Sequence, residues 1–356
     1  MKVIDRKKLI VKQDISLLEA IKLMNENSMQ ILIVVNEKNL LIGVVTDGDI
    51  RGAIVDNIDF NRQIISIMSR NPVTMKYPAD KNRALKLMKK RSVKHIPIVD
   101  NDGNFIDLLL LNDFLKNGNI SVNDKPNSVV IMAGGKGTRL DVFTKILPKP
   151  LIPIGEKPIL EHILDNFAKH GFINFLISLN YKADMIKMYF SENQHKFNID
   201  YVQEKEYLGT AGALSLAKEK LNDTFIVSNC DVIFDTDLER LFTHHKENKN
   251  HATILSTIQN IKIPYGVLKA QEGNLEEIIE KPEYTFLVNS GVYVFEPEII
   301  DLIPENQHVD MTNLLMSAKQ KGLKVNIYPM TCSWFDVGQW SEYKRAVDHL
   351  NAFKVD

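Results

Sequence analysis

The segment 129–140, VVIMAGGKGTRL, combines an apolar run with three closely spaced glycines and two cations. Glycine lets backbone N–H groups approach a phosphate closely, because no side chain stands in the way. Arg139 and, ten residues later, Lys149 carry full charges that can stabilise a phosphoryl group as its negative charge increases. The spacing therefore predicts a loop that holds the phosphates of a substrate. A tight strand-to-helix turn without a ligand is the alternative interpretation.

Two common phosphate-binding motifs do not fit this loop. A dinucleotide fingerprint that starts at Gly135 requires its third glycine where Leu140 stands. A P-loop requires serine or threonine directly after Lys136, and Gly137 occupies that position. The loop therefore belongs to neither class.

From residue 128 onward, short apolar runs alternate with amphipathic stretches. The segments are SVVIMA, PILEHILDNFAKHG, INFLISLN, KADMIKMYFSEN, IDYVQE, GALSLAKEKL, DTFIVSNCD, DLERLFTHHKEN and ATILST. This alternation predicts an α/β domain with a mainly parallel, Rossmann-like sheet that is covered by helices on both faces. Ligands of such sheets bind beyond the carboxyl ends of the strands, and the glycine loop follows the first run directly.

The first third of the chain contains an internal repeat with an offset of 64 residues. EAIKLMNENSMQILIVVN (19–36) aligns without gaps on RALKLMKKRSVKHIPIVD (83–100). The units, at about 1–62 and 65–118, are each predicted to form a helix, a strand, a turn, a second strand and another helix. Two copies of one such unit usually pack together. We therefore expect an α+β tandem domain, followed by a polar linker at 119–127.

The second part of the chain resembles the sugar-1-phosphate nucleotidyltransferases, or nucleotide-sugar pyrophosphorylases. Besides the glycine loop, the segments that carry the resemblance are LPKPLIPI, LGTAGAL, SNCD, PYGVL, EEIIEKP, VNSGVYVF and WFDVGQW, in the order of the family. The resemblance implies a GT-A-like nucleotidyltransferase domain at 128–356. One departure is Cys230, which stands where the family usually has glycine.

This resemblance also assigns roles to individual residues. The implied catalytic cations are Arg139, Lys149 and Lys281. The implied ligands of the Mg²⁺ cofactor are Asp231 and Asp336. The residues implied in nucleotide binding are Ala133, Gly134, Gly135, Gly137, Thr138, Glu204, Gly209 and Thr210. The residues implied in sugar-phosphate binding are Gly266, Glu280, Lys281 and Asn289. A lone aspartate after a strand is more often a helix N-cap than a metal ligand, so the joint presence of these segments carries the assignment.

The reaction implied by the resemblance joins a nucleoside triphosphate to a sugar 1-phosphate and releases pyrophosphate. A phosphate monoester is already a nucleophile at neutral pH, so no general base is required. Mg²⁺ would neutralise and orient the reacting phosphates. The loop and Arg139 would hold the triphosphate, while Lys149 and Lys281 would direct the attacking phosphate.

The base is indicated by Glu204. In uridylyl and thymidylyl members of the family, glutamine lies five residues before the glycine that corresponds to Gly209. A carboxylate has acceptors and no donor, so it complements N1–H and N2–H₂ of guanine and repels the carbonyls of uracil and thymine. GTP is therefore favoured. The alternatives are a base contact through Gln203, and uridylyl or thymidylyl transfer. The sugar is open between mannose 1-phosphate and the glucosamine 1-phosphate of bacterial legionaminic acid pathways.

The repeat resembles a pair of CBS domains. In that family a strand-to-helix corner, G-h-h-T-x-x-D, holds the ribose and phosphate of an adenine nucleotide. GVVTDGD (43–49) fits this corner, which implies Thr46 and Asp49 as ligands of a regulatory nucleotide; a helix cap formed by Thr46 is the alternative. In the second copy Leu110 replaces the threonine, so a single site is predicted. The resemblance further implies a homodimer or higher homo-oligomer. A nucleotide-sensing regulator with a weakly active transferase domain is the alternative function.

Composition narrows the class of protein. The net charge of −1 over 356 residues lacks the basic footprint of a nucleic-acid-binding protein. The N-terminal segment MKVIDRKKLIVKQD is too charged for a secretory signal, and the apolar runs are too short to span a bilayer. Cys230 and Cys332 are the only cysteines, which predicts a cytoplasmic protein with two buried thiols.

Overall fold

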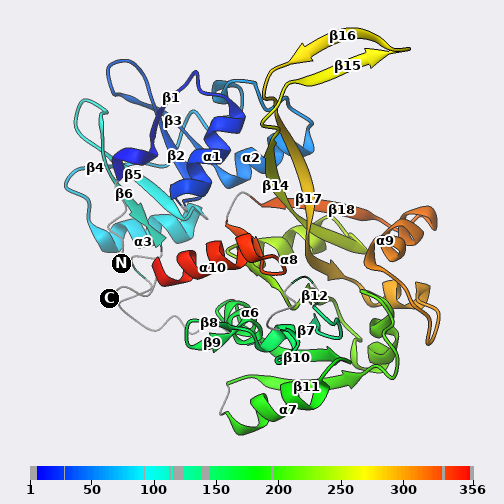
Figure 1. Cartoon of the computed structure of the whole chain (residues 1–356). Helices are drawn as coiled ribbons and strands as arrows, with labels where there is room; N and C mark the ends of the chain where they lie inside the picture. Colours follow the sequence, from blue (N-terminus) through cyan, green and yellow to red (C-terminus); the bar gives the residue numbers. More distant parts are fainter. Residues whose placement is uncertain are drawn as a thin grey trace.

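Figure 1 shows the computed structural model of the chain, which describes residues 6–27, 29–91, 93–111, 114, 124–137, 139, 144–193, 196–330 and 333–352. The predicted site residue Thr138, the cysteine at 332 and the linker residues 119–123 lie outside the described residues. Within these ranges, no helix combines the length and the apolar character that crossing a bilayer requires.

The described part of the N-terminal repeat forms two three-stranded sheets, each with one parallel and one antiparallel pair. The first unit contains β1 (Ile10–Lys12), α1 (Leu17–Asn27), β2 (Ile31–Val35), β3 (Leu41–Thr46) and α2 (Asp47–Val55). The second unit contains β4 (Met75–Lys76), α3 (Lys81–Arg91), β5 (His95–Val99) and β6 (Phe105–Leu110). Helix α1 buries one helical stripe, made of Leu17, Ala20, Ile21 and Met24. The predicted α+β tandem domain is confirmed, and we refer to residues 6–114 as the repeat domain.

The described residues from 125 onward build a seven-stranded sheet in the order β11-β10-β7-β12-β17-β14-β18. In that order the strands are Asn198–Gln203, Phe172–Leu179, Lys125–Met132, Phe225–Asn229, Glu283–Phe295, Ala252–Lys262 and Val325–Met330. Strand β17 runs antiparallel to both of its neighbours, and the other adjacent pairs are parallel. Val129 and Ile131 of β7 pack into one core, and Val130 packs into the other. The predicted mainly parallel sheet with two covered faces is confirmed.

Helices cover both faces of this sheet. Helices α6 (Ile159–Ala168), α7 (Ala183–Glu192), α8 (Leu238–Glu247) and α10 (Trp340–Ala352) contribute to one core. Helix α9 (Met311–Gln320) and the 3₁₀ helix η5 (Gly212–Lys220) contribute to the other. The structure differs from the sequence pattern at η5, where GALSLAKEKL predicts an ordinary helical stretch. The N–H groups of Ala211 and Gly212 both donate to the carbonyl oxygen of Val309, so the first turn is tied to a neighbouring segment.

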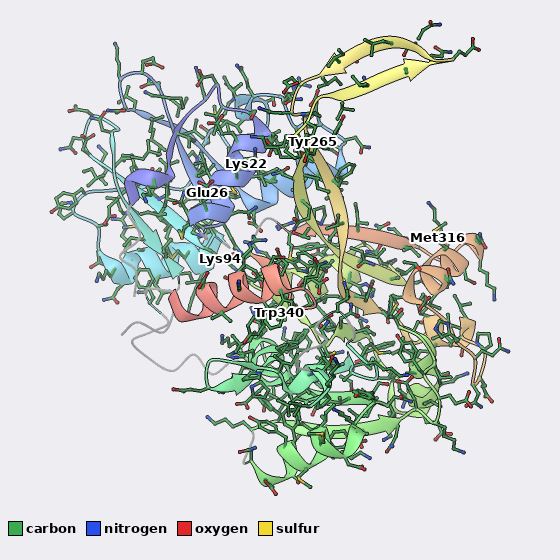
Figure 2. All side chains as sticks on the ribbon, in the orientation of Figure 1. Lys22, Glu26, Lys94, Tyr265, Met316 and Trp340 are labelled. Carbon is green, nitrogen blue, oxygen red and sulfur yellow. The ribbon has the colours of Figure 1, made fainter. Side chains whose placement is uncertain are left out.

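Strands β14 and β17 extend past the sheet as a two-stranded ribbon. The ribbon ends in a hairpin of β15 (Val267–Gln271) and β16 (Asn274–Ile279), which projects from the body of the molecule (Figure 1). Ile258 of the ribbon is buried in a core of the repeat domain. Lys22 of α1, labelled in Figure 2, pairs with Glu283 at the start of β17 over 2.6 Å. The ribbon therefore joins the two domains.

A second contact between the domains involves the corner that begins α2. A guanidinium nitrogen of Arg240 on α8 lies 3.6 Å from a carboxylate oxygen of Asp47. The guanidinium carbon of Arg51 lies 4.7 Å from the ring centre of Tyr328 on β18, which is within the range of a cation–π contact. The repeat domain thus also contacts helix α8 and β18, the edge strand of the sheet.

Candidate active site

The glycine loop follows β7 at the carboxyl edge of the sheet, where it lines a cavity of about 530 Å³. The N–H of Ala133 donates to the carbonyl oxygen of Ser178 at 2.9 Å, so the loop starts in register with β10. The lining residues are Met132, Gly134, Gly135, Lys136, Gly137, Arg139, Lys149, Asn180, Glu204, Tyr207, Gly209, Thr210, Asn229, Cys230 and Asp231. Six of the eight residues predicted to bind the nucleotide thus line this cavity.

Gly134 makes room for a carboxylate. A Cβ atom at this position would overlap Oε1 of Glu204 and would lie 3.3 Å from Cβ of Asn180. The sequence indicated a glycine that serves a phosphate, and the structure adds a steric reason from within the protein. Any side chain here would displace Glu204 from the cavity wall.

Glu204 follows β11 and is buried, with 3% of its surface exposed. The hydroxyl of Ser178 donates to its Oε1 at 2.8 Å, and the N–H of Leu208 donates to its Oε2 at 2.9 Å. The side-chain amide of Asn180 donates to its backbone carbonyl at 3.1 Å. Both donors to the carboxylate are neutral, and no described cation pairs with it. A buried carboxylate with only neutral donors gains from further hydrogen bonds, so Glu204 is well placed to accept N–H groups of a ligand.

The LGTAG turn packs against the start of α9. Gly209 has a φ angle of 82°, and a Cβ atom there would lie 2.6 Å from the carbonyl oxygen of Val309. Both observations require glycine at this position. The hydroxyl of the next residue, Thr210, accepts the N–H of Met311 at 2.8 Å. The Thr210 side chain therefore satisfies a free N–H at the N-terminus of α9.

A short antiparallel pair brings the two predicted metal ligands together. Strand β13 (Val232–Phe234) begins directly after Asp231, and β19 (Trp334–Asp336) ends on the other aspartate. The N–H of Val337 donates to the backbone carbonyl of Asp231 at 2.8 Å, which ties the two strand ends to each other.

Two cations face these carboxylates. Lys149 is buried, with 7% of its surface exposed, and it forms an ion pair with Asp231. A guanidinium nitrogen of Arg139 lies 3.7 Å from a carboxylate oxygen of Asp336. We call these four residues the charged cluster. Two positive and two negative groups are thus held together beside the glycine loop.

The two carboxylates of the charged cluster are oxygen donors of the kind that hard divalent cations prefer. A Cβ atom on Gly338 would lie 2.7 Å from Oδ1 of Asp336 and 2.8 Å from Nζ of Lys149, so the absence of a side chain at Gly338 leaves room for these two groups. Burial and the carboxylate of Asp231 raise the pKa of Asp336. Mg²⁺ is usually bound by one or two protein carboxylates, and substrate phosphates supply further oxygen ligands. The described residues contain no group of three or more His, Cys, Asp or Glu that would favour a metal held by protein ligands alone.

Cys230 precedes the first of these aspartates and lies in the cavity wall. It is buried, and burial raises the pKa of its thiol to about 12. Its burial confirms the prediction of a buried, small side chain at this position, and the raised pKa favours the neutral thiol.

Three of the predicted sugar-phosphate residues meet at the base of the projecting hairpin. A Cβ atom on Gly266 would lie 3.1 Å from a carboxylate oxygen of Glu280. The ammonium of Lys281 is 4.0 Å from the same carboxylate, and both side chains are exposed. The walls of the described cavity do not include these three residues. Of the predicted catalytic cations, the structure brings two to the cavity and leaves Lys281 on the hairpin.

Asn289 lies on β17, close to the point where the ribbon joins the sheet. Its side-chain amide donates to the hydroxyl of Tyr293 at 2.8 Å, and its Oδ1 accepts the N–H of Gly291 at 3.0 Å. These bonds fix the side chain within its own strand.

Three polar residues beside the cavity were not found from the sequence. They are Ser178, Asn180 and Asn229. The two asparagines stand at or just after the carboxyl ends of β10 and β12, and a polar residue at the end of a buried strand was the available signal. Ser178 carried a weaker signal, as a single hydroxyl within an apolar strand.

The predicted nucleotide corner of the repeat domain forms a capping box at the start of α2. A carboxylate oxygen of Asp49 accepts both the N–H and the hydroxyl of Thr46 at 2.7 Å. The hydroxyl oxygen of Thr46 accepts the N–H of Asp49 at 3.4 Å. The two predicted ligand residues thus satisfy each other, as expected for the helix-cap alternative. A nucleotide at this corner would have to compete with these bonds.

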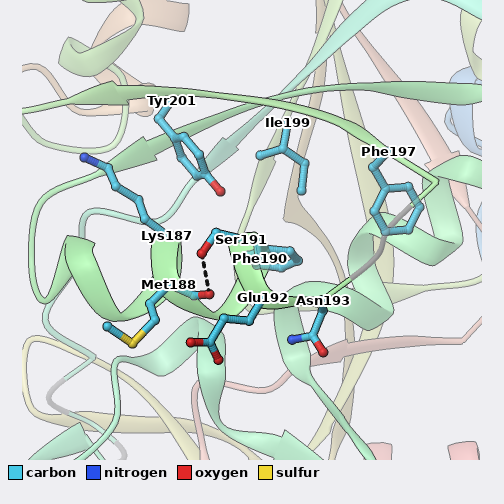
Figure 3. A pocket seen from close by; sticks show the side chains of 9 residues that line it. All are labelled: Lys187, Met188, Phe190, Ser191, Glu192, Asn193, Phe197, Ile199 and Tyr201. Atoms are coloured by element: carbon cyan, nitrogen blue, oxygen red, sulfur yellow. Dashed lines mark hydrogen bonds between the residues drawn. The ribbon is translucent and has the colours of Figure 1, made fainter.

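A second cavity, of about 760 Å³, lies between α7 and the edge strand β11 (Figure 3). Its lining residues are Lys187, Met188, Phe190, Ser191, Glu192, Asn193, Phe197, Ile199 and Tyr201. The hydroxyl of Ser191 donates to the carbonyl oxygen of Met188 within its own helix. The lining mixes polar and apolar side chains and contains none of the residues predicted to act in chemistry.

Comparison with known families agrees with this architecture. Residues 128–352 match the family described as nucleotidyl transferase, and residues 2–56 and 64–118 each match the CBS domain. The chain is similar to a UTP–glucose-1-phosphate uridylyltransferase of Synechocystis, with 32% identity over 61% of this chain and 62% of the relative. It is also similar to a mannose-1-phosphate guanylyltransferase catalytic subunit beta of Xenopus tropicalis, with 33% identity over 60% and 62%. The chain thus spans about 62% of the length of these curated relatives.

Among solved structures, the chain is similar to HddC from Yersinia pseudotuberculosis. The identity is 26%, the match covers 63% of this chain and 99% of the other, and the TM-score is 0.51. A UDP-glucose pyrophosphorylase from Acinetobacter baumannii shares the fold, with a TM-score of 0.52 and 20% identity over 65% and 95% of the two chains.

Proposed function

Because the chain belongs to the nucleotidyl transferase family, we propose that it transfers a nucleotidyl group, guanylyl by preference, to a sugar 1-phosphate and releases pyrophosphate. The observation that carries this proposal is the charged cluster beside a cavity lined by glycines. Two anionic substrates repel each other, so the main task of such an enzyme is to hold and neutralise their phosphates. A buried lysine, an arginine, two aspartates and open backbone N–H groups are suited to that task.

Each member of the charged cluster has a distinct role in this proposal. Asp231 and Asp336 would hold Mg²⁺, which would neutralise part of the charge of the phosphates. Arg139 binds the leaving pyrophosphate. Its side chain is 61% exposed, so the guanidinium can stay in contact with the product while the product leaves the cavity. Lys149, which pairs with Asp231 in this structure, would direct the attacking phosphate. Lys281 contacts the attacking phosphate from the hairpin, which must approach the cavity for this contact.

The preference for guanine rests on Glu204. Its buried carboxylate accepts two neutral donors and has no described cation beside it, so the N1–H and N2–H₂ groups of guanine would add favourable bonds. Further support comes from the guanylyltransferases among the relatives and from the HddC structure in complex with GMP-PN. A uridylyltransferase also occurs among the relatives, so UTP is the competing substrate to test.

The test is a pyrophosphate-release assay of the full chain with Mg²⁺. GTP, UTP, dTTP and ATP are each combined with the 1-phosphates of mannose, glucosamine and glucose. We expect turnover with a sugar 1-phosphate and a higher kcat/KM for GTP than for the other triphosphates. Pyrophosphate release with UTP or dTTP at higher kcat/KM than with GTP would reject the guanine assignment. No release with any pair would reject the transferase.

For the CBS pair, we propose one regulatory nucleotide at Thr46 and Asp49 and a role in a homodimer. Support comes from the CBS match and from the contacts that join this corner to the transferase domain. Calorimetry of the full chain with ATP, ADP, AMP and GTP tests the site, and light scattering tests the dimer. Binding of equal strength in an Asp49→Ala variant would contradict the site. We further propose that the reaction occurs in the cytoplasm, in line with the two cysteines of the chain.

A further inference from the structure

Ser178 is a buried hydroxyl within the apolar strand β10. Its side chain is 1% exposed, and its hydroxyl donates to Oε1 of Glu204 at 2.8 Å. Burial of a hydroxyl is unfavourable unless it forms a hydrogen bond, and here the acceptor is a carboxylate on the neighbouring strand's end. The hydroxyl of Ser178 therefore has its hydrogen-bond partner in Glu204.

The carboxylate of Glu204 is held from three sides. Ser178 donates to one oxygen, and the backbone N–H of Leu208 donates to the other. The backbone of Gly134 lies against the oxygen that Ser178 binds, without space for a Cβ atom. These contacts fix the rotation of the carboxylate plane, a torsion that is otherwise broad for glutamate. Each oxygen still has acceptor capacity for a donor from the cavity.

We infer that Ser178 is a positioning residue that sets the base selectivity of the transferase by fixing the carboxylate plane of Glu204. This inference rests on the proposed function, because it takes Glu204 to contact the base. The paired N1–H and N2–H₂ donors of guanine require both carboxylate oxygens in one defined plane. A carboxylate that is free to rotate loses this bidentate match and also turns its repulsive oxygens away from a uracil carbonyl.

Loss of the Ser178 hydroxyl should therefore weaken recognition of the base and leave binding of the phosphates unchanged. In Ser178→Ala, Oε1 of Glu204 loses its hydrogen bond from the serine hydroxyl, while the N–H of Leu208 still donates to Oε2. A hydrogen bond to a charged group corresponds to about a 10-fold or larger change in binding. We expect the ratio of GDP to UDP affinity to fall about 10-fold, and the GTP to UTP ratio of kcat/KM to follow, mainly through KM.

The experiment measures GDP and UDP binding by calorimetry, and pyrophosphate release with GTP and UTP, in the full chain. The variants are Ser178→Ala, Ser178→Thr, which keeps the hydroxyl, and the control Ser228→Ala. Ser228 is a fully buried serine on β12 whose hydroxyl donates to the backbone carbonyl of Asn229 at 3.0 Å. We expect wild-type ratios in Ser178→Thr and in Ser228→Ala. If Ser178→Ala does not fold, Ser178→Cys takes its place, since it keeps the volume and has only a weak donor.

An unchanged GDP to UDP ratio in the alanine or cysteine variant overturns the inference, whichever base the wild type prefers. An equal shift in Ser228→Ala also overturns it, because the effect would then follow from any lost buried hydroxyl. A wild type that prefers UDP contradicts the guanine assignment alone, and a changed ratio in Ser178→Ala would still support the positioning role.

Discussion

Replacement of Lys149 by methionine tests how the charged cluster is held together. The substitution removes the ammonium and keeps much of the side-chain volume. Lys149 is 7% exposed and pairs with Asp231, whose side chain is 13% exposed, so K149M leaves a largely buried carboxylate beside a second one. Arg139 is 61% exposed and lies 3.7 Å from Asp336, so it compensates only in part. Removal of one partner from a buried ion pair costs about 3–5 kcal/mol, and we expect a loss of this size in the free energy of unfolding.

Mg²⁺ should reverse much of this loss. In K149M a divalent cation can bind the two carboxylates without first breaking an ion pair, whereas in the wild type it competes with Lys149. A ligand that binds only the folded state stabilises it by about 2.7 kcal/mol when its concentration is 100 times its Kd. We therefore expect Mg²⁺ to stabilise K149M by clearly more than it stabilises the wild type.

The assay is urea unfolding with EDTA and with Mg²⁺, for the wild type, K149M and the control K220M. Lys220 is 47% exposed and pairs with Asp200, which is 64% exposed, and such surface pairs contribute about 0–1 kcal/mol. A loss in K149M no larger than in K220M would refute the buried ion pair. An equal effect of Mg²⁺ on K149M and the wild type would refute a metal on these carboxylates.

Three further predictions concern single residues. Asp231→Asn should abolish pyrophosphate release and leave the circular dichroism spectrum unchanged, because it removes a proposed metal ligand; near wild-type turnover would exclude that role. Glu204→Gln should lower the GTP to UTP ratio of kcat/KM by about 10- to 100-fold, since one bidentate base contact is lost, and an unchanged ratio would end the base assignment. Burial lowers the pKa of His245 to about 4 from 6.5, so below pH 6.5 the unfolded state binds the proton first. The free energy of unfolding should therefore be about 2 kcal/mol lower at pH 5 than above pH 6.5. His245→Gln should make this dependence on pH less steep in urea unfolding, and an unaltered dependence would contradict the burial argument.

The sequence by itself determined the tandem repeat and the alternation of strands and helices from residue 128 to residue 257. Alternating apolar runs predict parallel strands, and the repeat with an offset of 64 residues predicts a tandem domain, because both signals depend on residues that are close in sequence. The glycine loop is equally local, since three glycines within four positions define its backbone. The predicted helical stretch at Gly212–Lys220 shows the limit of this approach, since it forms a 3₁₀ helix that begins with hydrogen bonds to the distant Val309.

Only the tertiary structure decided which side chains face one another. Lys149 pairs with Asp231 across 82 positions, and the register of β13 on β19 places the second aspartate beside the first. Neither contact has a local signal, because it depends on how distant strands end at one edge of the sheet. The same reason left Ser178 unnoticed beside Glu204. A hydroxyl in an apolar strand gains a function only when folding brings an acceptor to it, and that acceptor follows a different strand.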